Sequence, residues 1–283
     1  MAWWKQVVAA LVVLGVAAPG AVASNADIAA LQVALRARGV YGATVDGVGG
    51  PATAAGVRRV QARRRLAVDG VAGPATRRAL GWRGRPNLGS RPVVPGARGW
   101  DVAALQFLLA RAGFPSGPFD GDGGPRFAAA LRRYQSWAGL PADGVAGPAT
   151  ISRLGGAPAR SPLRFQMPVS APIGDGFGPR GGAFHTGVDF VASTRAPVVA
   201  AGRGCVTFAG YDDGYGALVV IAHGLGVTTW YAHLSHRDVV PGQCVAPGAR
   251  VGLVGATGHA TGPHLHFEVR VRGAATNPRF ALP

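Results

Sequence analysis

The first half of the chain repeats itself, and this repeat constrains the fold more than any other feature of the sequence. Residues 27–80 align without a gap onto residues 101–154, and Asp101 lies 74 residues after Asp27. A unit of this length is too long for one turn of a solenoid. We therefore expect two copies of one small domain.

Each copy has the pattern of a three-helix unit. Apolar residues recur at helical spacing in the first segment, as at Ile28, Leu31 and Leu35. An Asp-Gly-x-x-Gly-Pro turn follows, in which glycine permits a positive φ and proline fixes the start of the next helix. We predict second helices over residues 54–66 and 127–140, each followed by a second such turn and a short third helix. The aspartates and glycines of these turns are expected to be structural.

Shifts in composition divide the 283 residues into domains. The two helical copies are expected at residues 24–82 and 99–156. Stretches rich in Gly, Pro and Arg predict linkers at residues 83–98 and 157–164. The remaining residues, 165–283, are expected to form a separate domain.

The seven histidines all lie between His185 and His266, so the chemistry is confined to this last domain. Residues two apart in a strand share a face, and His264 and His266 are therefore expected to project into the same space. His185 and Asp189 follow a glycine-rich run, and we place them on a turn that enters a strand. Two neutral imidazoles and one carboxylate make the ligand set of a catalytic zinc site, whose fourth position holds water.

Three other histidines are not expected to belong to the metal site. Taken singly, His223, His236 and His259 are typical of packed or surface side chains. The motifs His-x-x-x-Asp, Tyr-Ala-His and His-x-His rarely occur by accident in this order within one small domain.

Together these segments resemble the lysostaphin-type zinc endopeptidases over residues 165–283. The resemblance rests on Phe177-Gly-Pro-Arg180, His185-Thr-Gly-Val-Asp189, Tyr231-Ala-His233-Leu234 and Gly262-Pro-His264-Leu-His266-Phe267. It implies a mostly antiparallel sheet and a substrate that is the peptide part of peptidoglycan. The residues that it implies for the site are His185, Asp189 and His266 as ligands of one Zn²⁺ per chain, and His233 and His264 as catalytic histidines.

The acid–base work is expected to fall to the two catalytic histidines. The sequence has no His-Glu-x-x-His helix, which excludes a glutamate base of that type. One of His233 and His264 would move the proton and the other would stabilise the oxyanion. The sequence leaves open which does which. Glu268 is expected to face away from His266 and to be structural.

The helical copies resemble the peptidoglycan-binding domain, a three-helix module. The signature is Asp-Gly-x-x-Gly-Pro-x-Thr, which occurs at residues 69–76 and again at residues 143–150. The predicted fold class is therefore multidomain α + β, with two small three-helix domains followed by a mostly antiparallel β-sheet catalytic domain.

The start of the chain reads as a secretory signal peptide over residues 1–23. Lys5 precedes an apolar core, and Ala21-Val-Ala23 is a small-x-small cleavage signature. The alternative, an uncleaved anchor, has an apolar run of about 17 residues, at the short limit for spanning a membrane. We expect an exported protein, located outside the cell, in the cell wall or in the periplasm.

The sequence contains two cysteines, Cys205 and Cys244. An even count in an exported chain favours a disulfide, and closing a loop of about 40 residues stabilises by roughly 3 to 4 kcal/mol. Zinc ligation by these thiolates is disfavoured, because the cysteines lack ligand spacing and the histidine and aspartate set is already complete.

A net charge of +16, carried almost wholly by arginine, favours polyanionic partners. Anionic wall or membrane-surface polymers fit an exported protein, and the sequence has no nucleic-acid module. We expect a monomer.

Two non-catalytic functions are the alternatives: a regulator that activates other wall hydrolases, and a purely structural wall-binding protein. The presence of all five site residues argues against both. If the helical domains act as tethers, deleting residues 24–160 would weaken action on intact wall more than on a small peptide.

Overall fold

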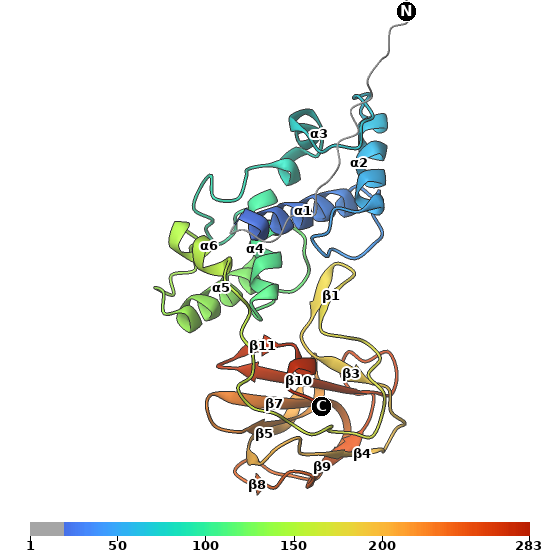
Figure 1. Cartoon of the computed structure of the whole chain (residues 1–283), viewed down its shortest axis with the longest axis vertical. Helices are drawn as coiled ribbons and strands as arrows, with labels where there is room; N and C mark the ends of the chain where they lie inside the picture. Colours follow the sequence, from blue (N-terminus) through green and yellow to red (C-terminus); the bar gives the residue numbers. More distant parts are fainter. Residues whose placement is uncertain (1–19) are drawn as a thin grey trace, which may run out of the picture.

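The structure, a computed structural model, describes residues 20–283, with side chains from Asn25 onward. Most of the predicted signal peptide, residues 1–19, lies outside the described residues. Helices gather at one end of the molecule and strands at the other, which confirms the predicted fold class (Figure 1). The helices are α1 (Gly20–Ala37), α2 (Pro51–Arg63), α3 (Pro74–Ala79), the 3₁₀ turn η1 (Gly81–Gly84), α4 (Trp100–Arg111), α5 (Pro125–Ala138) and α6 (Pro148–Leu154).

Each repeat forms three helices, as predicted. The second and third helices of both repeats begin with a proline that follows a glycine. Proline lacks an N–H and its φ is already helical, so it suits the first turn. For this reason α2 and α5 begin at Pro51 and Pro125, earlier than residues 54 and 127. None of the helices among the described residues is both long and apolar enough to cross a bilayer.

The Asp-Gly turns are held by glutamines from inside each repeat. Gln61 Nε2 donates to Asp69 Oδ1 at 2.6 Å and to the Val71 carbonyl at 2.9 Å, while its Oε1 accepts from the Gly70 N–H at 2.9 Å. The same arrangement recurs three times, around Gln32, Gln106 and Gln135. These aspartates are therefore engaged in folding, in agreement with their expected structural role.

The two helical units share one hydrophobic core instead of standing apart. Helix α1 packs against α4, and buried apolar side chains of both repeats form a single cluster. Trp100 Nε1 donates to Asp27 Oδ1 at 2.6 Å across this contact. The physical reason lies in α4, whose residues from Trp100 to Ala110 are all buried. A helix that is apolar on all sides needs partners on all sides.

The strands form a mostly antiparallel sheet in which β10 takes a central place. The main sheet runs in the order β11-β10-β7-β6-β5-β8, while β3 also pairs with β10, and β9 joins β7 to β4. A two-stranded hairpin, β1–β2, projects from it. The strands are β1 (Gly178–Arg180), β2 (Ala183–His185), β3 (Val188–Phe190), β4 (Pro197–Val199), β5 (Gly204–Asp212), β6 (Gly216–Ala222), β7 (Val227–Arg237), β8 (Cys244–Val245), β9 (Arg250–Val254), β10 (Leu265–Val271) and β11 (Ala274–Thr276), and the turn η2 (Pro278–Phe280) follows.

Both helical units form hydrogen bonds with the tip of the β1–β2 hairpin. The N–H groups of Val45 and Phe119, which are equivalent positions of the two repeats, donate to the neighbouring carbonyls of Gly181 and Gly182 at 2.8 and 2.7 Å. A second contact joins the Ala275 N–H of β11 to the Gly113 carbonyl at 3.0 Å. The tip of β1 thus reaches the helices in Figure 1. The hairpin that ends in the first predicted metal ligand is fastened to both repeats.

The predicted disulfide is present between Cys205 on β5 and Cys244 on β8. Replacing both cysteines by serine is expected to lower the free energy of unfolding by roughly 3 to 4 kcal/mol, since the open chain gains the entropy of a loop of about 40 residues. Urea unfolding followed by far-ultraviolet circular dichroism measures this. An unchanged midpoint in the double variant would contradict it.

Candidate metal centre

Three side chains meet in the sheet domain at one point. Strand β3 pairs with β10 so that Asp189 lies directly opposite His266, while His185 ends β2. Asp189 Oδ1 lies 2.8 Å from His266 Nδ1 and 3.1 Å from His185 Nε2, and the two nitrogens are 3.0 Å apart. All three side chains are buried. The structure brings together the three residues predicted to bind the metal.

This donor set fits zinc. Two imidazole nitrogens and one carboxylate oxygen are common zinc ligands, and three protein ligands leave a fourth position open for solvent or substrate. Bonds of about 2.0 to 2.1 Å in a tetrahedral arrangement separate ligand atoms by about 3.3 Å. The observed separations need to widen by only a few tenths of an ångström.

Hydrogen bonds fix which nitrogen of each ligand ring is free. His185 Nδ1 donates to the Gly176 carbonyl at 2.8 Å, and His266 Nε2 donates to Glu268 Oε1 at 3.0 Å. Carbonyl and carboxylate oxygens only accept, so the ring protons lie on these nitrogens. The lone pairs of His185 Nε2 and His266 Nδ1 are therefore directed to the centre, as in metal sites whose ligand histidines are oriented by a second hydrogen bond.

The expectation that Glu268 faces away from His266 is wrong. Residues two apart in a strand project from the same face, and Glu268 is completely buried beside the imidazole. Its Oε1 accepts from Tyr215 at 2.9 Å, and Oε2 is paired with Arg270 at 2.5 Å. Burial raises the pKa of Glu268, but Arg270 and His266 outweigh it and hold the pKa well below its usual range. The ionised carboxylate can therefore orient His266.

Asp189 is oriented in the same way by Arg180 of the hairpin. Arg180 Nη2 donates to Asp189 Oδ2 at 2.8 Å, which leaves Oδ1 directed at the two histidines. Burial raises the pKa of Asp189, but its hydrogen bonds with His185, His266 and Arg180 hold the pKa below its usual range. The carboxylate is ionised, as a metal ligand must be.

The two predicted catalytic histidines lie beside this centre. Their rings are 4.8 Å apart, and His264 Nε2 lies 3.8 Å from Asp189 Oδ1. His233 Nδ1 donates to the Thr257 carbonyl at 2.7 Å and His264 Nδ1 to the Gly262 carbonyl at 2.8 Å. In both rings Nε2 is consequently the nitrogen that can accept a proton.

His233 is held in an unusual backbone conformation. Its φ is +60°, a region that costs a non-glycine residue about 1 to 3 kcal/mol and is found at functional sites. Burial lowers the pKa of His233 most, the bond to Thr257 opposes this, and His266 and His264 add to it, giving a pKa of about 4. The ring is therefore neutral near pH 7.

The other histidines differ in position. His223 is bonded to Thr229 at 2.7 Å, and His236 lies on the surface near Asp238, so both have the structural roles expected of them. His259 instead lines the cleft around the centre.

The cleft has a volume of about 790 Å³, and its walls come from both parts of the molecule. Gly117 and Arg126 of the second helical unit line it together with Tyr215 and His259 of the sheet domain. Arg126 could not be predicted from its neighbours in the sequence, because its place in the cleft depends on how the domains pack. The glycine-rich run before His185 could have pointed to Arg180.

Zinc affinity is expected to rise with pH up to about pH 9. Burial lowers the pKa of His266, but Asp189 and Glu268 outweigh it and raise the pKa to about 9. In protein stripped of metal, His266 Nδ1 therefore carries a second ring proton at neutral pH, and zinc must displace this proton. We expect the zinc dissociation constant to fall about tenfold per pH unit between about pH 7 and 9, as measured by competition with a chelating dye. A constant independent of pH would contradict this.

The comparisons place this geometry in a known class. Residues 183–278 match the model of peptidase family M23, and residues 24–80 and 98–154 each match the model described as "Putative peptidoglycan binding domain". The sheet domain is thus an M23 metallopeptidase domain, and it follows two domains of the second family, which confirms the resemblances drawn from the motifs.

Named relatives match over the sheet domain. The chain is 48% identical over 100 residues to the DD-carboxypeptidase/endopeptidase Mpg of Neisseria meningitidis serogroup B, covering 35% of this chain and 23% of the relative. It is 43% identical over 95 residues to the peptidoglycan DD-endopeptidase ShyC of Vibrio cholerae, covering 34% and 22%. The chain therefore spans less than a quarter of these relatives' length. Among solved structures, the catalytic domain of lysostaphin from Staphylococcus simulans is 34% identical, with a TM-score of 0.37, covering 38% of this chain and 90% of that one.

Proposed function

We propose that this chain is an exported zinc endopeptidase that cuts peptide bonds of bacterial peptidoglycan. The observation that carries the proposal is the convergence of His185 Nε2, Asp189 Oδ1 and His266 Nδ1 within 3.1 Å of one another at the floor of a cleft. The M23 match of the domain supports the reaction class.

His233 is suited to accept a proton during the reaction. When bound by the three ligands, zinc polarises the scissile carbonyl and makes water reactive at neutral pH. With a pKa of about 4 the His233 ring is neutral at pH 7, and its Nδ1–H is held by Thr257. Its Nε2 can therefore take the proton of the attacking water and pass it to the leaving amine.

His264 occupies the other side of the same cleft. A ring at this position can hold the developing oxyanion once its Nε2 carries a proton. The bond from Nδ1 to the Gly262 carbonyl keeps this nitrogen available. We propose that His233 and His264 act as a pair.

The bond to be cut is proposed from the named relatives. One is named DD-carboxypeptidase/endopeptidase and the other peptidoglycan DD-endopeptidase, and both names favour the bond between D-alanine and a diamino acid. A polyglycine bridge is the alternative substrate. The two helical domains and the charge of +16 support a location at an anionic wall.

The proposal is tested with the purified chain and isolated peptidoglycan. We expect mass analysis of the released muropeptides to show cleavage at the D-alanine bond, lost in a chelator and restored by zinc. Cleavage that persists in the chelator would contradict the zinc mechanism. Wall binding without any cleavage would instead identify a non-catalytic regulator.

A further inference from the structure

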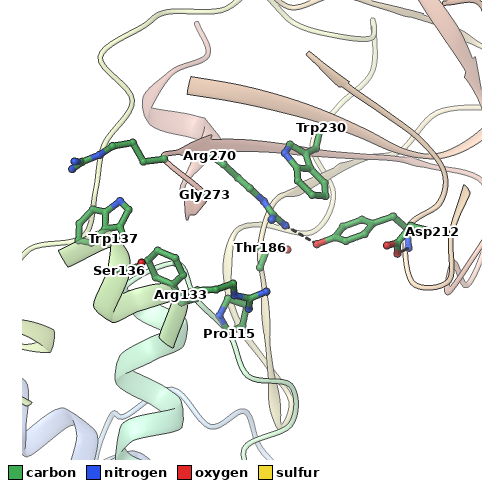
Figure 2. A pocket seen from close by; sticks show the side chains of 13 residues that line it. Pro115, Arg133, Ser136, Trp137, Thr186, Asp212, Trp230, Arg270 and Gly273 are labelled. Atoms are coloured by element: carbon green, nitrogen blue, oxygen red, sulfur yellow. Dashed lines mark hydrogen bonds between the residues drawn. The ribbon is translucent and has the colours of Figure 1, made fainter. Parts of the chain in front are cut away.

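A second cavity, of about 760 Å³, lies between the second helical unit and the sheet. Figure 2 shows side chains of α5 on one side and of the sheet on the other, facing one another across it. The helical wall includes Arg133 and Trp137, and the opposite wall includes Trp230, Arg270 and Arg272.

The cavity carries positive charge that the protein leaves unbalanced. Arg270 is paired with the buried Glu268 and stacks on Trp230 with 3.7 Å between guanidinium and ring. Arg133 and Arg272 are exposed, and within residues 20–283 neither forms an ion pair. The single acid of the lining is Asp212, whose Oδ1 already accepts from its own turn. Two free guanidinium groups thus line the cavity.

The cavity adjoins the cleft of the metal centre. Thr186 and Tyr215 line both spaces, and Thr186 directly follows the ligand His185. A chain bound across the centre can therefore continue into the cavity without leaving the protein surface.

The helical wall is fixed to the sheet at this point. Trp137 Nε1 donates to the Val271 carbonyl at 3.3 Å, and the Arg272 guanidinium lies 5.3 Å from the Trp137 ring. The backbone contact between Gly113 and Ala275 lies at the same edge. Arg133 and Arg272 therefore belong to one surface although they come from different domains.

We propose that this interdomain cavity is a substrate subsite that binds a carboxylate of the peptide being cut, through Arg133 and Arg272. Two guanidinium groups that line one cavity suit an anionic peptide, because arginine forms forked, charge-assisted bonds with carboxylates. The inference rests on the proposed endopeptidase function. It makes the second helical domain a part of the substrate-binding surface.

The test compares two soluble muropeptide substrates, one with free carboxylates and one with the same carboxylates converted to carboxamides. Replacing both Arg133 and Arg272 by glutamine is expected to raise KM for the acidic substrate about tenfold or more, with kcat unchanged, because a bond to a charged group is lost. KM for the amidated substrate should stay the same.

The matched control is Arg132→Gln, which removes the same charge from the neighbouring position of α5. The Arg132 side chain lies against the turn at Gly144 and does not line the cavity. KM for the acidic substrate should therefore not change in this variant. Two results would overturn the subsite. One is a KM for the acidic substrate that is the same in the double variant as in the unaltered protein. The other is an Arg132→Gln control whose KM for the acidic substrate rises as much as that of the double variant.

A protein that is not an endopeptidase would give a result that differs from failure of the subsite alone. In that case the unaltered protein cuts neither substrate, and equilibrium binding of the acidic muropeptide replaces KM as the measurement. Weaker binding in the double variant alone would then support an anionic peptide site without hydrolysis. Binding that is unaffected by the double replacement would overturn the subsite as well.

Discussion

Replacing Asp189 by alanine is expected to remove both the bound zinc and the hydrolytic activity. The carboxylate supplies one of the three proposed ligand atoms, and without it only the two imidazoles remain to hold the metal. Loss of carbonyl polarisation and water activation costs several kcal/mol, so we expect kcat/KM on a soluble muropeptide to fall by roughly a thousandfold or more. Zinc content is measured by mass spectrometry of the dialysed protein.

The control for this variant is Asp238→Asn. Asp238 pairs with Arg250 at 2.8 Å on the surface, away from the cleft. This variant should keep both zinc and activity. A dialysed Asp189→Ala protein that held one zinc per chain and still cut the substrate would show that the ligand set is wrong.

Replacing His233 by alanine is expected to abolish cleavage while zinc stays bound. His233 is not one of the three residues whose donor atoms converge, and the role proposed for it is proton transfer, which contributes about 10² to 10⁴ in rate. We expect kcat to fall by this factor and the metal content to stay at that of the unaltered protein. Loss of zinc from this variant would mean that His233 is itself a ligand.

His236 provides a matched control on the same strand. Its side chain is 65% exposed and lies near Asp238, outside the cleft. His236→Ala should keep kcat within about twofold, as expected for a surface substitution. A large loss there would show that the strand, and not the His233 ring, is sensitive to substitution.

Local patterns predicted the parts of the structure that depend on local physics. Strand alternation placed His264 and His266 on one face, and the strand pairing brings Asp189 opposite His266. The repeat and its Gly-Pro turns predicted three helices in each unit, and the even cysteine count predicted the pair Cys205–Cys244. In each case a few neighbouring residues decide the outcome.

Contacts between distant segments left little trace in the sequence. The shared core of the two helical units was missed, although the nearly unbroken apolar run of α4 was a signal for it. Val45 and Phe119 bind the hairpin through backbone N–H groups. Every residue except proline has such a group, so the residue types do not reveal this contact. Glu268 was misplaced for another reason. It lies two residues after His266 and therefore on the same face of the strand, whereas the prediction put it on the opposite face.

The packing of the domains also changes how the helical part should be tested. Deleting residues 24–160 removes the contacts at Gly181 and Gly182, in the hairpin that ends at His185. Such a deletion would alter the metal centre as well as any attachment to the wall. Point variants that keep the backbone bonds to Gly181 and Gly182, such as those at Arg133 and Arg272, separate the two effects.

The most direct test of the central claim is the location of zinc in crystals of the purified protein, by anomalous scattering at the zinc edge. We predict one zinc peak per chain, within bonding distance of His185 Nε2, Asp189 Oδ1 and His266 Nδ1, at about 2.0 to 2.2 Å from each. A crystal grown with ample zinc in which these three atoms stood apart and no peak lay between them would contradict the account.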